Sequence, residues 1–263
     1  MKALFKYSLI LAIALTGTAG ATKAQIRWEE EPQFDVRVSG KLDASARIYR
    51  PDDHQPKLIY LSKKFNAPLL IDLSSKKITK LSTEDLTAID DYTYSTKGVP
   101  AGKSIGSYTM ESGASVFKYN GKSVSIKIKQ TLVGEVPESV LLTHSPEYAV
   151  LRDSYKPKSK YVKKLKSVNK PIEIVVMFAT WCPTCKEIVP RFLKVKDKAG
   201  NAKFSVKYVG IAMGGNEPSD LLDKYGHDYP AFIFYHNGKE VDRIVGDPPV
   251  PIEQVMSEIL AKV

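Results

Sequence analysis

The most constraining feature of the sequence is an apolar run that ends three residues before a pair of cysteines. Residues 172–179, IEIVVMFA, carry a single polar side chain, Glu173. Such a run is typical of a strand that is buried on both faces of a sheet. Cys182 and Cys185 follow, and Pro183 between them suits the first position of a helix because its missing N–H is not needed there. We therefore expect the cysteines to lie where a buried strand turns into a helix.

The rest of residues 155–263 continues the alternation of strands and helices. A second apolar run covers residues 204–213, and Asn237-Gly238 predicts a two-residue hairpin turn between two further strands. Residues 251–263 repeat apolar side chains at helical spacing. The order α-β-α-β-α-β-β-α favours a mixed central sheet with flanking helices, since strand–helix–strand units give parallel neighbours.

Residues 26–150 have a different character. Residues 34–40 and 122–129 alternate apolar and polar side chains, as half-buried strands do, and Asn120-Gly121 predicts a tight hairpin. The pattern weakens into turn-prone sequence between residues 76 and 115, and no catalytic motif is present in this half. We predict a smaller, mainly-β domain that precedes the α/β domain.

Residues 1–24 have the layout of a secretory signal peptide. Lys2 and Lys6 precede a short apolar stretch and then small residues suited to cleavage. The apolar stretch is far shorter than the roughly 20 residues of a spanning helix. We expect an exported, soluble protein, periplasmic or secreted, with no membrane span after signal cleavage.

The net charge is +10, and removal of residues 1–24 takes away three lysines and no acid, which leaves +7. Seven of the remaining lysines lie in residues 155–170, interleaved with apolar side chains at roughly helical spacing. A basic run can bind nucleic acid or a membrane surface. In an exported chain we interpret this one as the solvated face of a helix and expect no nucleic-acid partner.

The two cysteines are the only ones in the 263 residues, and three uses are open to them. A structural disulfide across so short a loop would constrain the unfolded chain little. A zinc or copper(I) site needs further ligands. The chain has no second CxxC and only four histidines, of which His227 is the one expected near the pair. A redox pair fits best, because a helix N-terminus stabilises a thiolate. Cys182 would attack and Cys185 would resolve the mixed disulfide.

The segment WCPTCKEIVP resembles the active-site segment of the thioredoxin family. Trp181 precedes the first cysteine, and Pro190 lies where members of that family often have a helix-kinking proline. Residues 229–246, YPAFIFYHNGKEVDRIVG, resemble the second signature of the family, and the whole resemblance covers residues 155–263. It implies a thioredoxin fold in which Pro230 is a cis-proline facing the cysteines, and in which Trp181, Tyr229 and Pro230 receive the substrate.

Two departures from the family pattern bear on mechanism. Many thioredoxins have a buried aspartate six residues before the first cysteine, where this chain has Val176. Glu173 and Glu187 are the nearest acids in the sequence that could replace it. The residues between the cysteines are Pro183 and Thr184, and this dipeptide tunes the redox potential in the family. The export signal, the attached N-terminal domain and the missing aspartate resemble the extracytoplasmic thioredoxin-like proteins of the TlpA/ResA kind.

The resemblance implies a thiol–disulfide oxidoreductase that acts on protein thiols or disulfides, here expected to be a reductant. It needs no organic cofactor and no metal, but it needs a membrane or soluble redox partner to recharge it. Two alternatives stay open at this point. The protein could be a disulfide oxidase or isomerase whose first domain dimerises or captures substrate, or a CxxC module that binds a metal or a partner. The oligomeric state is left open by the sequence.

Overall fold

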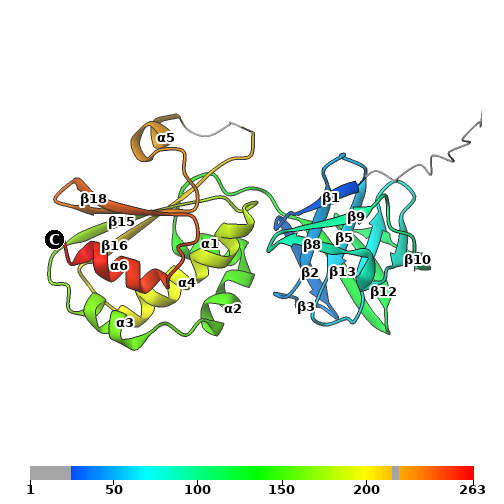
Figure 1. Cartoon of the computed structure of the whole chain (residues 1–263), viewed down its shortest axis with the longest axis horizontal. Coiled ribbons are helices and arrows are strands. Elements are labelled where there is room, and N and C mark those ends of the chain that lie inside the picture. The colour runs from blue at the N-terminus through cyan, green and yellow to red at the C-terminus, as the bar shows by residue number, and fades with distance from the viewer. Residues whose placement is uncertain (1–24, 215–218) are drawn as a thin grey trace, which may run out of the picture.

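The computed structural model describes residues 25–214 and 219–263, which form two regions that lie side by side (Figure 1). We call residues 25–128 the β region and residues 134–263 the α/β region. The expected signal peptide, residues 1–24, lies outside the described residues.

The β region is built from two antiparallel sheets. The larger has eight strands in the order β10-β7-β6-β5-β4-β1-β9-β8. Most of its strands follow one another as hairpins, and a short 3-10 helix, η1 (Thr83–Asp85), precedes β8. The strands are β1 (Gln25–Glu30), β4 (Arg47–Pro51), β5 (Lys57–Leu61), β6 (Leu69–Asp72), β7 (Lys77–Lys80), β8 (Thr87–Asp90), β9 (Thr93–Lys97) and β10 (Lys103–Ser107).

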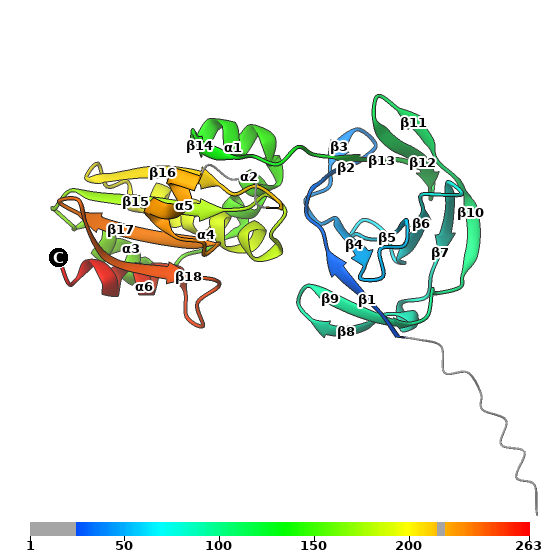
Figure 2. The same ribbon diagram turned by 90° about the horizontal axis from the view of Figure 1, so that it is seen from above.

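The second sheet of the β region has five strands in the order β11-β12-β13-β2-β3. Asn120 and Gly121 connect β12 to β13 with φ angles of 47° and 73°, so the predicted hairpin is confirmed. The two sheets face each other around a core to which both contribute, including Ile48, Phe117 and Val124 (Figure 2). The strands are β2 (Phe34–Val38), β3 (Lys41–Leu42), β11 (Thr109–Glu111), β12 (Ala114–Tyr119) and β13 (Lys122–Ile128).

The α/β region contains a mixed five-stranded sheet in the order β14-β16-β15-β17-β18. β15 is central; it pairs in parallel with β16 and antiparallel with β17. The apolar run at residues 172–179 forms β15, as predicted, and all but one of the seven residues of β15 are buried. The strands are β14 (Gly134–Val136), β15 (Ile172–Phe178), β16 (Phe204–Gly210), β17 (Ala231–His236) and β18 (Lys239–Val245).

Helices cover both faces of this sheet; in Figure 1, α4 and α6 lie below it and α5 above it. The helix α4 (Pro183–Ala199) begins immediately after Cys182 and turns Ile188, Phe192 and Leu193 into the core, where none of the three is exposed. Gly200 ends it in a left-handed conformation. The other helices are α1 (Glu138–His144), α2 (Pro146–Ser154), α3 (Ser159–Lys166), α5 (Ser219–Tyr225) and α6 (Ile252–Leu260).

The boundary between the regions differs from the expected one. The sequence predicted that the mainly-β part would extend to about residue 150. In the structure, β14 pairs with β16, and Leu141 of α1 and Tyr148 of α2 are buried in the core of the α/β region. The short helices α1 and α2 carry too few apolar residues to be predicted as amphipathic helices from the sequence. Their packing against the sheet, rather than a local pattern, assigns them to the second region.

Candidate active site

The cysteine pair lies where β15 leads into α4, as the sequence predicted. Cys182 is the N-cap of α4, with extended backbone angles, and Pro183 is its first helical residue. Cys182 is 7% exposed and Cys185, in the first turn, is completely buried. The unpaired N–H groups of this helix end therefore point toward the first sulfur.

Backbone N–H groups surround both sulfurs. The N–H of Cys185 donates to the Sγ of Cys182 at 3.2 Å, and the N–H of Ala179 donates to the Sγ of Cys185 at 3.4 Å. Both residues are free thiols in this structure. Hydrogen bonds of this kind stabilise a thiolate more than a thiol.

The two thiols differ in acidity. The pKa of Cys182 is lowered, first because the thiol of Cys185 donates a hydrogen bond to its sulfur, and further because Cys185 and Thr184 donate backbone N–H bonds. The pKa of Cys185 is raised well above the usual value, chiefly by burial and secondly by its hydrogen bond to Cys182. Cys182 is therefore the group that ionises first, and Cys185 holds its proton.

An aromatic pair borders the cysteines on the side of Trp181. The rings of Trp181 and Tyr229 meet edge to face with centroids 5.1 Å apart, and Tyr229 is 36% exposed. The indole N–H of Trp181 donates to the carbonyl of Ile211 at 3.3 Å, which fixes the ring. The Tyr229–Pro230 peptide bond is cis, as expected.

Comparisons with known proteins point to the same family. The family model for thioredoxin matches residues 154–258. Thioredoxin-2 of Saccharomyces cerevisiae is 36% identical over 100 residues, which are 38% of this chain and 89% of that protein. The chain belongs to the thioredoxin family.

Two other thioredoxins have similar coverage. Thioredoxin-1 of Schizosaccharomyces pombe is 33% identical over 30% of this chain and 73% of its own length. The thioredoxin of Malassezia sympodialis is 28% identical over 33% of this chain and 80% of its own length. The α/β region is thus a thioredoxin domain with thiol–disulfide oxidoreductase activity, and the residues matched by the family model do not include the β region.

The thioredoxin domain has no acid where many members of the family have a buried aspartate. Val176 is completely buried in the middle of β15. Glu173, one of the two acids considered as a replacement, lies at the start of the same strand and pairs with Lys207 at 3.3 Å. Glu187, the other, pairs with Arg47 of the β region at 3.2 Å. Both carboxylates are thus neutralised by a cation.

A tyrosine that the sequence did not indicate lies in the same buried core as the cysteines. Tyr148 of α2 belongs to the same buried cluster as Cys182 and Cys185. Its pKa is raised well above the usual value, first by burial and then by the charge of Cys185. A single tyrosine in a short helix, 37 positions before Cys185, carries no motif that could have indicated this.

The β region also reaches the site, which the sequence did not indicate. Lys186, the residue after Cys185, donates to Oε1 of Glu30 and to the carbonyl of Ala46, each at 3.2 Å. Burial raises the pKa of Tyr92 of the β region, and the nearby side chain of Thr184 lowers it. The β region therefore comes close to the segment between the two cysteines.

Within the described part of the chain, no set of metal ligands surrounds the cysteines. His227 is exposed. Across residues 25–214 and 219–263, no three His, Cys, Asp or Glu side chains are grouped so that they could hold a metal ion. Over the same residues, no helix combines the length and the apolar character that a membrane crossing needs.

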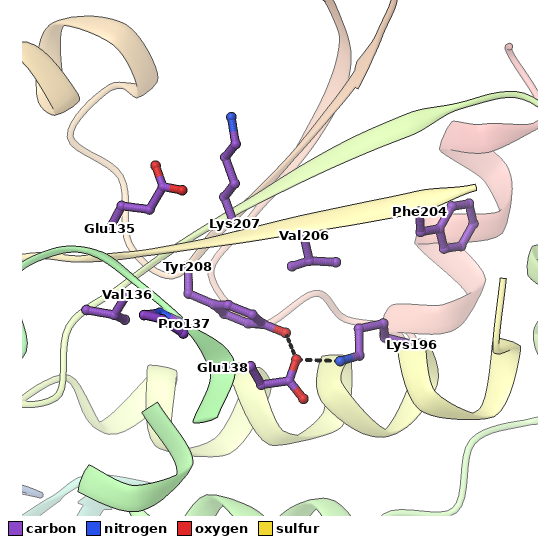
Figure 3. A pocket seen from close by; sticks show the side chains of 9 residues that line it. All are labelled: Glu135, Val136, Pro137, Glu138, Lys196, Phe204, Val206, Lys207 and Tyr208. Atoms are coloured by element: carbon purple, nitrogen blue, oxygen red, sulfur yellow. Dashed lines mark hydrogen bonds and ion pairs between the residues drawn. The ribbon is translucent and has the colours of Figure 1, made fainter. Parts of the chain in front are cut away.

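A groove of about 570 Å³ is lined by residues of β14, α1, α4 and β16, and neither cysteine is among its lining residues (Figure 3). Glu138 is its centre: it accepts a hydrogen bond from Tyr208 at 2.5 Å and pairs with Lys196. Lys196 is eleven residues beyond Cys185 in α4, or roughly 16 Å along the helix. The contacts join α1, β16 and α4, so we interpret this cluster as a structural link and not as part of the redox site.

Proposed function

We propose that this protein is an exported thiol–disulfide oxidoreductase of the TlpA/ResA kind that reduces disulfides in other proteins through Cys182 and Cys185. The observation that carries the exchange chemistry is the unequal pair: Cys182 with a lowered pKa at a helix N-terminus and Cys185 buried beside it. The similarity to thioredoxins supports the direction toward reduction. The composition of residues 1–24 supports export.

The reaction has two exchange steps. The thiolate of Cys182 attacks one sulfur of the substrate disulfide, forms a mixed disulfide and releases the other substrate sulfur as a thiolate, which takes up a proton. Cys185 then loses its proton and attacks the sulfur of Cys182. The second substrate thiol leaves, and a Cys182–Cys185 disulfide remains. Two electrons pass to the substrate, and an external dithiol or membrane electron carrier must restore the thiols.

Residues around the pair have separate roles in this proposal. Trp181, Tyr229 and Pro230 form the surface against which the substrate segment lies. Thr184 supports the thiolate through its N–H and its hydroxyl, and Pro183 begins the helix. No organic cofactor is required.

Trapping the mixed disulfide tests the exchange chemistry. Insulin chains are first reduced, and their thiols are then converted to activated mixed disulfides. The Cys185→Ser variant should accumulate a disulfide between Cys182 and such an insulin chain. The Cys182→Ser variant should trap none. The wild type should also reduce insulin with dithiothreitol as electron source. If nothing is trapped and insulin is not reduced, the proposed chemistry is wrong.

The reduction potential of the Cys182–Cys185 pair tests the direction. A potential near that of thioredoxin, roughly −270 mV, supports a reductant, whereas one near roughly −120 mV would identify an oxidant and overturn the proposed direction. Export is tested separately by fractionating cells that express the full chain and by sequencing the N-terminus of the mature protein. A start near residue 25 in the extracytoplasmic fraction supports the proposal; retention of residue 1 in the cytoplasm would refute it.

A further inference from the structure

The turn between β8 and β9 brings the β region to the redox motif. These two strands form a hairpin in which Asp90 pairs with Thr93, so Asp91 and Tyr92 are at its tip. In Figures 1 and 2 the hairpin lies on the side of the β region that faces α4. Burial raises the pKa of Tyr92, and the nearby side chain of Thr184, which stands between the two cysteines, lowers it.

Arg47 of β4 fixes this turn relative to the thioredoxin domain. Its guanidinium donates to the carbonyl oxygen of Asp91 at 2.8 Å and lies 5.7 Å from the centre of the Tyr92 ring. The same group pairs with Glu187 of α4 at 3.2 Å and with Glu30 at 3.3 Å. One half-buried cation therefore holds the turn, the β region and the first turns of α4 together.

Trp181 and Thr184, which lie on either side of Cys182 and Pro183, each have a tyrosine near them. Tyr229 of the thioredoxin domain packs on Trp181, which precedes Cys182. Tyr92 of the β region lies near Thr184, which follows Pro183 and lowers the pKa of Tyr92 against the larger, raising effect of burial. Only 7% of Cys182 remains accessible. A polypeptide whose sulfur reaches Cys182 must therefore pass beside the β8–β9 turn.

The side chains of the β8–β9 turn are more exposed than those that form the buried contact between the two regions. Asp90 and Asp91 are exposed and Tyr92 is only partly buried. The buried part of the contact is made instead by Lys186 and Glu30, whose side chains are 10% and 0% exposed. The turn thus keeps accessible side chains near the start of α4, while Lys186 and Glu30 supply the buried contact.

We infer that the β8–β9 turn is a substrate-contacting segment of the redox site, and that Tyr92 determines specificity for polypeptide disulfides over small ones. This inference rests on the proposed function. A polypeptide bound at Cys182 covers Tyr92 and Asp91, whereas a small disulfide reaches the sulfur without touching them.

The kinetic test compares two disulfides with the pre-reduced, full-length protein. Tyr92→Ala should lower the second-order rate constant for insulin at least five-fold more than that for the small disulfide 5,5′-dithiobis(2-nitrobenzoate). Tyr92→Phe separates the ring from its hydroxyl. Met110→Ala, on the exposed β11 strand of the other sheet, serves as the control and should leave the ratio of the two rate constants unchanged. An unaltered ratio in Tyr92→Ala overturns the inference. Failure of the wild type to react with either disulfide overturns the proposed function, and the inference with it.

A crosslinking test does not depend on how Tyr92→Ala folds. A photo-crosslinking amino acid is placed at Asp91, whose side chain is exposed and whose contact to Arg47 uses only the backbone carbonyl. In the Cys185→Ser mixed disulfide with an insulin chain, illumination should crosslink position 91 to the insulin chain. The same group at Met110 should give no crosslink. Formation of the mixed disulfide without crosslinking at position 91 would refute the inference and leave the proposed function intact.

Discussion

Lys186 and Glu30 form an almost completely buried ion pair across the boundary between the thioredoxin domain and the β region, with Nζ and Oε1 3.2 Å apart. Lys186 directly follows Cys185, so the pair ties the β region to the first turn of the redox helix. Arg47 adds a second cation to Glu30 at 3.3 Å. The β region is thus attached to the catalytic helix itself and not only through the connecting chain.

Removal of one member of this pair should weaken the attachment strongly. Lys186→Met leaves the buried carboxylate of Glu30 with Arg47 alone, and a broken buried pair costs about 3 kcal/mol or more. We expect a corresponding fall in the free energy of unfolding in urea, and faster hydrogen exchange in β1 and in the first turns of α4. The exposed pair of Lys262 and Asp242 is the matched control, since Lys262→Met should cost less than about 1 kcal/mol. If Lys186→Met and Lys262→Met lost the same free energy of unfolding, the buried pair would not stabilise the attachment of the β region.

The acidity of Cys182 should depend on its neighbour Cys185. An ordinary cysteine has a pKa of about 8.5. Because hydrogen bonds lower the pKa of Cys182, its thiolate persists to lower pH than that of an ordinary cysteine. The rate of alkylation by iodoacetamide should therefore reach its half-maximal value below that pH. Cys185→Ala removes the largest of the lowering hydrogen bonds and should move the midpoint upward.

Two further variants check the cause of that shift. Cys185→Ser keeps a donor and should raise the midpoint less than Cys185→Ala. Thr184→Val removes only a smaller hydrogen bond from a hydroxyl and should also raise it less. A midpoint that is the same in all four proteins would show that the helix end alone sets the acidity of Cys182.

Gly210 should be essential for the way the connecting chain enters the thioredoxin domain. A Cβ at this position would lie 2.4 Å from the carbonyl oxygen of Leu132, so the chain just before β14 would have to move. We expect Gly210→Ala to cost about 1–3 kcal/mol of unfolding free energy, as overpacking does. Hydrogen exchange should rise at residues 134–136, which pair with β16. Ser205→Ala, on an exposed part of the same strand, should change stability by less than about 0.5 kcal/mol.

The local parts of the fold and of this site were predictable from sequence because they rest on short-range patterns. The apolar run of β15, the proline at the start of α4 and the Asn120-Gly121 turn each depend on neighbouring residues. The resemblance to the thioredoxin family predicted the cis-proline, Pro230, which lies 45 residues beyond Cys185. The contacts of Glu30, Arg47 and Tyr92 were not predictable. They join residues 92 to 156 positions apart through side chains of ordinary type, and no periodicity or spacing records such a contact.

The absence of a buried acid at Val176 should limit the second exchange step. Cys185 has a raised pKa, so it must lose a proton before it attacks the mixed disulfide. By resemblance to other thioredoxins, Val176→Asp restores a carboxylate that can accept this proton. We expect faster resolution of a preformed Cys182 mixed disulfide near pH 7, followed by the change in Trp181 fluorescence in a stopped-flow instrument. Stability should fall at the same time, because Val176 is completely buried and a carboxyl group there is desolvated.

Val176→Asn separates proton transfer from a change in packing. Asparagine has nearly the shape of aspartate and brings a similar cost of burying a polar group, but its amide does not accept the thiol proton. Val176→Asp should therefore resolve the mixed disulfide faster than Val176→Asn, and the difference should vanish at low pH, where the carboxyl group is protonated. Burial raises the pKa of such a carboxyl group, so the difference should already shrink above the usual range for aspartate, near pH 4. Equal rates at pH 7 would show that the proton of Cys185 leaves by a route that needs no carboxylate at position 176.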